Sequence, residues 1–213
     1  MDADGAVPIS VPSGDRPART PVRREEIVTA AAVYFAEHGY ASVGMRDIAQ
    51  AVGIKGASLY NHFHSKEEIL YAIALRMTKD PLVHLHVLDE EGSPADRLMQ
   101  LVEIHVRHLA EHRVEHLVAL RELTYLLPEH RAVVKDHRKY YQRRVRDVIA
   151  AGARSGEFVV RDAGQSAIAV LDLMNGISWW LRDGVDVELL VADYLGFARR
   201  ILGYGSTTTG VSK

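Results

Sequence analysis

The chain has 213 residues, of which 47% are hydrophobic, so it holds enough apolar material for the core of one large domain or two small ones, and disorder throughout is excluded. It contains no cysteine, which excludes disulfides and cysteine-ligated zinc or iron-sulfur sites and leaves His, Asp and Glu as the ligands for any metal. A formal net charge of -2 does not suggest a nucleic-acid partner, because a DNA-binding surface is usually basic.

The N-terminal segment, residues 1–20, carries Pro8, Pro12 and Pro17 among Gly, Ser and Asp. This composition cannot bury enough apolar surface to offset the entropy of ordering the segment, so it is predicted to be a disordered arm. The segment lacks the basic and apolar regions of a signal peptide, and no run of about 18 apolar residues occurs in the chain. We therefore expect a cytoplasmic protein with no membrane partner.

Residues 21–66 predict three short helices. Apolar residues at helical spacing indicate a first helix over 21–38, with Gly39 as its C-cap. Two shorter apolar sets follow on either side of Gly53, and glycine permits the tight left-handed turn between them. Two short helices joined by such a turn are typical of a helix-turn-helix, in which the second helix points outward. The apolar residues shared by these two helices are Ile48, Ala49, Val52, Ile54 and Leu59.

The rest of the chain keeps the helical pattern. Ser65 and Glu68 form a capping box that opens a long helix, which Pro81 is expected to kink or end. No segment alternates like a strand, so the fold class is all-α with about nine helices, and the polar residues 204–213 are predicted to be a flexible tail. Further helices are predicted from Ser93 to a break near residues 111–113, over 114–125, 128–155, 163–182 and 187–201.

The stretch MRDIAQAVGIKGASLYNHFHSKEEIL, from Met45 to Leu70, resembles the DNA-binding segment of TetR-type transcriptional regulators. Each matching piece is weak by itself, but their order and spacing together are specific. The resemblance implies an N-terminal helix-turn-helix domain over residues 21–66 and an effector-binding and dimerisation domain over 67–203. The matching pieces are Phe35 and Gly39, Met45 to Ala49, Val52-Gly53, Leu59-Tyr60, His62-Phe63 and Ser65-Lys66-Glu67.

The resemblance also implies a mode of action. It predicts a ligand-responsive repressor that binds a near-palindromic operator as a homodimer through its last two helices, and that a small molecule releases. An activator, or a regulator whose ligand is a co-repressor, has the same fold and stays open. Residues 163–182 are apolar on nearly every side, so they are expected to be buried, in part against a second copy.

The predicted reading helix presents small and polar residues that can approach base edges. We expect Lys55 and Asn61 to contact bases, whereas the resemblance places Tyr60 and Lys66 on phosphates. No acidic residue lies between Ile48 and Lys66, which removes the objection raised by the net charge. The full predicted set for DNA is Gly44, Lys55, Gly56, Ser58, Tyr60, Asn61, His62 and Lys66. Gly44 departs from the family pattern, because many members carry a Ser or Thr cap there.

The predicted effector site consists of polar or aromatic residues on or beside inward-facing helical stripes. A buried charge needs a partner, which a ligand can supply. For Arg121 two interpretations stay open, an internal salt bridge and a ligand anion, and Trp179 suits a core, a dimer interface or a stacking platform. The predicted residues are His105, Arg121, Tyr125, Asp172, Asn175 and Trp179.

Two further patterns have competing interpretations. Four histidines, at 105, 108, 112 and 116, resemble a metal site only if one helix carries them all, so the expected break near 111–113 favours no metal and no cofactor. A run of basic residues is either a solvated helix face or an attractor for an anionic effector, such as an acyl-CoA or another lipid-like anion. That run contains Lys135, Arg138, Lys139, Arg143, Arg144 and Arg146.

Two other classes of protein fit the sequence less well. An enzyme is disfavoured because the sequence contains no nucleophile elbow, phosphate-binding loop or HExxH spacing. A helical interaction module that does not bind DNA is the second alternative, and it does not account for the ordered motif between Met45 and Leu70. We therefore expect a DNA-binding regulator that is not an enzyme.

Overall fold

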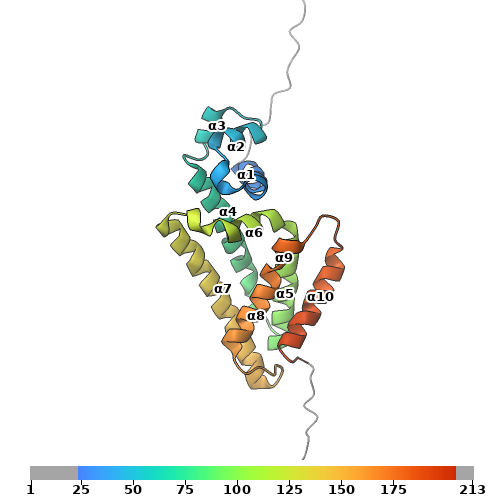
Figure 1. The fold of residues 1–213 in the computed structure, drawn as a ribbon. Coiled ribbons are helices and arrows are strands. Elements are labelled where there is room, and N and C mark those ends of the chain that lie inside the picture. The colour runs from blue at the N-terminus through green and yellow to red at the C-terminus, as the bar shows by residue number, and fades with distance from the viewer. Residues whose placement is uncertain (1–23, 205–213) are drawn as a thin grey trace, which may run out of the picture.

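The computed structural model describes residues 24–204, in which every regular element is helical and none is a strand. If α9 is counted as the end of α8, this range forms nine helices, as predicted. Figure 1 shows a small helical head, formed by the first three helices, on top of a broader helical body. The predicted arm and residues 205–213 of the predicted tail lie outside the described residues.

The head consists of α1 (Arg24–His38), α2 (Met45–Ala51) and α3 (Gly56–Tyr60), with the short 3₁₀ turn η1 (Tyr40–Ser42) after α1. Gly53 has a φ of 69°, so the left-handed turn predicted between α2 and α3 is confirmed. The apolar residues that define the two helices close over a common core with α1. Fully buried side chains in this core include Ile27, Phe35, Ile48, Leu59 and Phe63.

Helix α4 (Lys66–Val83) joins the head to the body. The Ser65 hydroxyl accepts a hydrogen bond from the Glu68 N–H at 3.1 Å, whereas the Glu68 carboxylate accepts from the His64 N–H at 2.8 Å and not from Ser65. Half of the predicted capping box is therefore present. Pro81 lies in the last turn of α4, and the chain continues at once as the 3₁₀ helix η2 (His84–Asp89), as expected near a proline.

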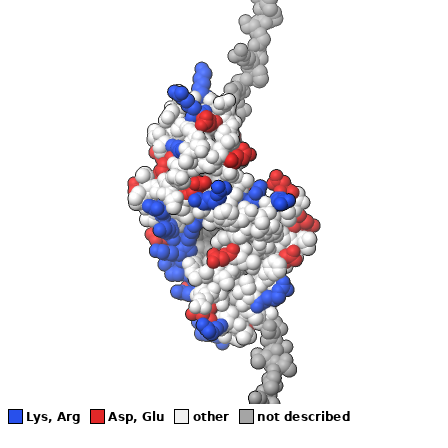
Figure 2. All heavy atoms as spheres, viewed as in Figure 1, with Lys and Arg blue, Asp and Glu red and all other residues white. Residues whose placement is uncertain are grey.

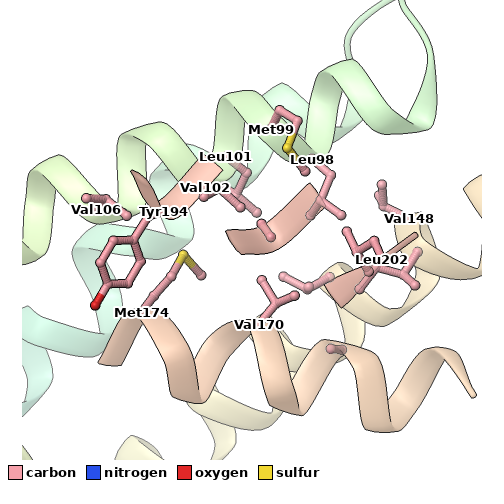
Figure 3. Close-up of a cluster of buried hydrophobic side chains, with 14 of the residues drawn as sticks. Leu98, Met99, Leu101, Val102, Val106, Val148, Val170, Met174, Tyr194 and Leu202 are labelled. Carbon is pink, nitrogen blue, oxygen red and sulfur yellow. The ribbon is translucent and has the colours of Figure 1, made fainter. Parts of the chain in front are cut away.

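The body contains α5 (Pro94–Glu111), α6 (Arg113–Arg121), α7 (Pro128–Ser155), α8 (Ala163–Asn175), α9 (Ile177–Trp180) and α10 (Val187–Ile201), with the 3₁₀ turn η3 (Leu123–Tyr125) after α6. The predicted break between α5 and α6 is confirmed at His112. Figure 3 shows the body's core, where Val102 and Val106 of α5 lie near Met174 of α8 and Tyr194 of α10.

The single helix predicted over 163–182 is wrong in one respect. It is interrupted at Gly176, after which α9 forms one short turn whose Ser178 hydroxyl lies 2.6 Å from Nδ1 of the buried His116. Ile168, Trp179 and Trp180 are exposed in the single chain, so the predicted burial of this segment on every side stays a prediction that requires the second copy. An apolar pattern indicates which side chains avoid water, but it does not indicate whether the same chain or a second copy covers them.

A close approach in the body gives a test of its packing. A Cβ atom on Gly152 of α7 would overlap the ring of Phe158, which is buried beside it. We expect Gly152→Ala to lower the free energy of unfolding by about 1–3 kcal/mol, since the ring has to move within a packed core. Gly56→Ala is the control, because nothing lies within 4 Å of the added carbon. Urea unfolding that finds the two variants equally stable would contradict this packing.

Candidate DNA-binding surface and ligand cavity

The outer face of α3 carries the residues predicted to read DNA. Lys55, Asn61 and His62 are exposed, and Tyr60 is 50% exposed although it lies on a helix whose other large side chain, Leu59, is fully buried. Gly56 and Ser58 are half-buried at the base of the same surface. Figure 2 shows Lys and Arg side chains projecting from the end of the molecule that carries this helix. The geometry therefore leaves the predicted base readers free to enter a groove.

At the start of α2, the backbone amide of Gly44 is already hydrogen-bonded and is not free to bind a phosphate. The Gly44 N–H donates to the Asp47 carboxylate at 2.7 Å, so this amide is already satisfied within the chain. Any amide contact to a phosphate has to come from the following residues, in the first turn of α2. The predicted role of Gly44 thus narrows to capping the helix.

Lys66 also has a structural role that its sequence position did not indicate. Its ammonium donates to the Tyr40 carbonyl at 2.6 Å and lies 4.2 Å from the centre of the Tyr40 ring. Partial burial lowers the pKa of Lys66. The side chain therefore ties the start of α4 to the turn after α1. If Lys66 also contacts a phosphate as predicted, its ammonium has to bind the phosphate and the Tyr40 carbonyl together.

A cavity of about 300 Å³ lies in the body between α4, α5, α6, α7 and α8. Three of the residues predicted for the effector, His105, Asp172 and Asn175, line it. The polar residues that join them and were not in the predicted set are Thr78, His116, His137, Arg138, Tyr141 and Gln142. The apolar remainder of the lining is Met77, Pro81, Leu109, Leu120, Ile168 and Leu171.

Arg121, Tyr125 and Trp179 do not line the cavity, so the inward positions predicted for them are wrong. Arg121 is the exposed last residue of α6, and Tyr125 lies beyond the end of that helix, half exposed against the Tyr40 ring. Trp179 follows the interruption at Gly176 and is 61% exposed. Arg121 thus lies at the very end of its helix, and for Tyr125 and Trp179 the helical face was extrapolated past the point where the helix ends.

The missed residues on α7 had one usable signal. His137, Arg138, Tyr141 and Gln142 recur at the spacing that places side chains on neighbouring faces of one helix. Arg138 was instead grouped by charge with the exposed residues around it. Sequence alone does not show which member of a basic run turns inward, because that depends on where α8 crosses α7.

His105 and His116, two of the histidines that line the cavity, are uncharged hydrogen-bonding groups. His105 Nδ1 lies 2.8 Å from the Tyr141 hydroxyl, and burial, together with the nearby His108, lowers the pKa of His105 to about 3. Burial likewise lowers the pKa of His116 to about 3 and that of His108 to about 4. Over residues 24–204, no three His, Asp or Glu side chains are grouped in a way that could hold a metal ion.

Arg138 is the permanent cation of the cavity wall. Its Nη2 donates to the carbonyl oxygen of Ala119 on α6 at 3.2 Å, and burial lowers the pKa of the guanidinium. Within the described part of the chain it forms no ion pair, unlike Arg144, which lies 2.6 Å from Asp89, and Arg146, which lies 2.7 Å from Asp147. Figure 2 shows the basic residues of α7 as a band along the body. The predicted basic run is thus a solvated face with one inward member.

Helix α6 belongs both to the cavity wall and to the head. His116 and Leu120 face the cavity, whereas Val118 and Ala119 are buried in the apolar cluster formed by α1, α2, α3 and the first part of α4. Glu115 of the same helix accepts a hydrogen bond from Arg76 of α4 at 2.6 Å. The head and the cavity therefore share one helix.

The neutral state of His116 predicts a pH dependence. The unfolded chain binds a proton on this imidazole below about pH 6.5 and the folded chain only near pH 3, so stability falls as the pH drops through that window. Between pH 7 and 5, His116→Gln should lose about 2 kcal/mol less unfolding free energy than the wild type. The exposed His64→Gln is the control. Equal losses in all three proteins in urea unfolding would contradict the buried neutral histidine.

Lys66 and Lys55 form a matched pair of lysines for testing whether Lys66 stabilises the fold. We expect Lys66→Met to lower the free energy of unfolding by about 1 kcal/mol, because it removes a charge-assisted hydrogen bond to the Tyr40 carbonyl. Lys55→Met removes an exposed side chain and should leave stability within about 0.5 kcal/mol of the wild type. Thermal or urea unfolding that ranks the two variants the other way would refute this assignment.

Two family models match the chain. The model for bacterial regulatory proteins of the tetR family matches residues 27–73, and the model for the Tetracyclin repressor-like C-terminal domain matches residues 91–202. The first contains the helix-turn-helix, and the second contains most of the helices that surround the cavity. None of the helices over residues 24–204 has the length and apolar character needed to span a bilayer.

Individual proteins agree with these matches. The chain is 32% identical over 139 residues to the HTH-type transcriptional repressor KstR2 of Mycobacterium tuberculosis, covering 64% of this chain and 69% of KstR2. A solved tetR-family regulatory protein from Rhodococcus RHA1 superposes with a TM-score of 0.79 and 31% identity, covering 85% of this chain and 97% of that one. AibR, solved with isovaleryl coenzyme A and operator DNA, shares the fold with a TM-score of 0.73 and 23% identity, covering 85% and 98%. The chain belongs to the TetR family of bacterial transcriptional regulators.

Proposed function

We propose that the protein is a cytoplasmic transcriptional repressor that binds its operator as a homodimer and releases it when a small molecule enters the cavity. The observation that carries this proposal is the position of α6, which lines the cavity with His116 and packs into the DNA-binding head with Val118 and Ala119. A ligand that moves α6 therefore acts on the head directly. On this proposal the protein acts by binding and not by catalysis.

A second copy is the proposed cover for the exposed apolar residues near the C-terminus. Leu189 is 61% exposed on α10, and Ile168 is exposed on α8, which packs beside α10. Large apolar side chains grouped on a surface are typical of interfaces, and a symmetric pair of α8 and α10 would bury them. The exposed apolar side chains of this part of the chain are Ile168, Trp179, Trp180, Val185, Val187, Leu189, Phe197 and Ile201.

The proposed effector is an anion. Arg138 supplies a positive charge inside the cavity, and Lys135, Lys139 and Arg143 lie exposed on the same helix. AibR, whose structure contains isovaleryl coenzyme A, supports an acyl-CoA or another lipid-like anion as the class to test first. Repression is favoured over activation because two similar proteins, KstR2 of Mycobacterium tuberculosis and AcnR of Corynebacterium efficiens, are both named as transcriptional repressors.

The dimer and the operator can be tested together. Leu189→Asp with Phe197→Asp places two charges in the proposed interface, so the variant should elute with the mass of one chain instead of two and lose at least tenfold in operator affinity. Size-exclusion chromatography with light scattering gives the mass, and gel shifts on DNA upstream of the gene give the affinity. Asp193→Asn, an exposed change on the same helix, is the control.

A monomeric wild-type protein, or a monomeric variant that binds the operator as tightly as the wild type, would contradict the proposed dimer. A wild-type protein that shifts no DNA from its own upstream region, and does not change the output of a reporter placed behind that region, would contradict the repressor.

A further inference from the structure

We propose that the cavity binds the carboxylate of a free organic acid, that Arg138 is the counter-ion of this carboxylate, and that the acid releases α6 by competing with the Ala119 carbonyl for the Arg138 guanidinium. This inference rests on the proposed function and narrows its effector from an anion in general to a carboxylate held inside the body.

Among the described residues that line the cavity, Arg138 is the only lysine or arginine. Arg138 is cationic, whereas His105 and His116 are neutral because burial lowers their pKa values to about 3. Asp172 is the one carboxylate among the lining residues, and it is exposed and forms no ion pair with a described residue. A partly desolvated cation whose one hydrogen bond goes to a carbonyl leaves donors and charge for an anion.

The size and lining of the cavity favour a free acid over a thioester. A volume of about 300 Å³ is at the lower end of ligand sites, and part of the lining is apolar, with Leu109, Leu120 and Leu171. A carboxylate matches the planar fork of a guanidinium, while a thioester carbonyl carries no charge for Arg138. The phosphates of an acyl-CoA would instead remain outside, near Lys135 and Lys139, which are exposed.

The same side chain connects the ligand to the head. Arg138 holds α6 through the Ala119 carbonyl at 3.2 Å, and Ala119 is itself buried against the head. A carboxylate is a stronger acceptor for a guanidinium than a neutral carbonyl is, so it draws Arg138 away from α6. Coupling of this kind changes the affinity for the second ligand by roughly 5–150-fold in typical cases.

The test uses the full-length homodimer, calorimetry for ligand binding and gel shifts for the operator. The probes are straight-chain acids from butanoate to decanoate, with hexanamide as the neutral isostere and hexanoyl-CoA as the thioester. We expect at least one acid to bind and to weaken operator binding at least fivefold, hexanamide to do neither, and hexanoyl-CoA to bind more weakly than that acid.

Variants on α7 test whether Arg138 supplies the positive charge that binds the acid. Arg138→Met should weaken binding of the acid at least tenfold while the protein still binds the operator, and Arg138→Lys should restore part of the binding because it keeps the charge without the fork. Lys139→Met, an exposed change one residue away, should respond like the wild type. Thermal unfolding of each variant confirms that the protein measured is folded.

Three results would overturn the inference while leaving the repressor intact: hexanamide binding as tightly as hexanoate, hexanoyl-CoA binding that depends on Lys135 and Lys139 but not on Arg138, or operator binding with no response to any acid in the series. Acid binding that depends on Arg138 in a protein that binds no operator would support the carboxylate site and refute the proposed function.

Discussion

Helix α6 packs on two sides, and this double packing joins the head to the cavity. One side of this nine-residue helix is buried with the helix-turn-helix, through Val118 and Ala119, and the other side faces the cavity, through His116 and Leu120. A packed core does not deform continuously, so a displacement of α6 has to be passed to the head or resisted by it. The Arg76–Glu115 pair fixes the same helix to α4, which is the covalent link between the two parts.

The electrostatics of the cavity follow from burial more than from composition. His105 and His116, whose pKa values fall to about 3, contribute hydrogen bonds but no charge at neutral pH, and Arg138 supplies the permanent positive charge of the cavity wall. On α7 the neighbouring arginines 144 and 146 are paired with aspartates and remain at the surface. A formally acidic chain therefore presents a basic band outside and a single cation inside, and the net charge of -2 describes neither.

The sequence was sufficient for the fold and for the surface of α3, because short-range signals determine both. Gly53, the break at His112 and the end of α7 at Gly156 are where caps and turns predicted them. The cavity was only partly predictable. His105 lies inside α5, and Asp172 and Asn175 lie on α8 before its interruption, whereas Arg121 is the last residue of α6 and Trp179 follows the interruption at Gly176. Arg138 and Lys66 depend on contacts between distant segments, with Ala119 and Tyr40, that no local pattern shows.

If α6 transmits the occupancy of the cavity to the DNA-binding heads, ligand binding should change the distance between the two heads of the proposed dimer. The chain has no cysteine, so Glu37→Cys on the exposed end of α1 gives one spin label per chain. Pulsed electron paramagnetic resonance should show that a bound acid shifts the distance distribution of the labelled protein. The same label in a protein that also carries Arg138→Met should show no shift. A distance distribution that stays unchanged while the acid saturates the cavity would contradict the coupling through α6.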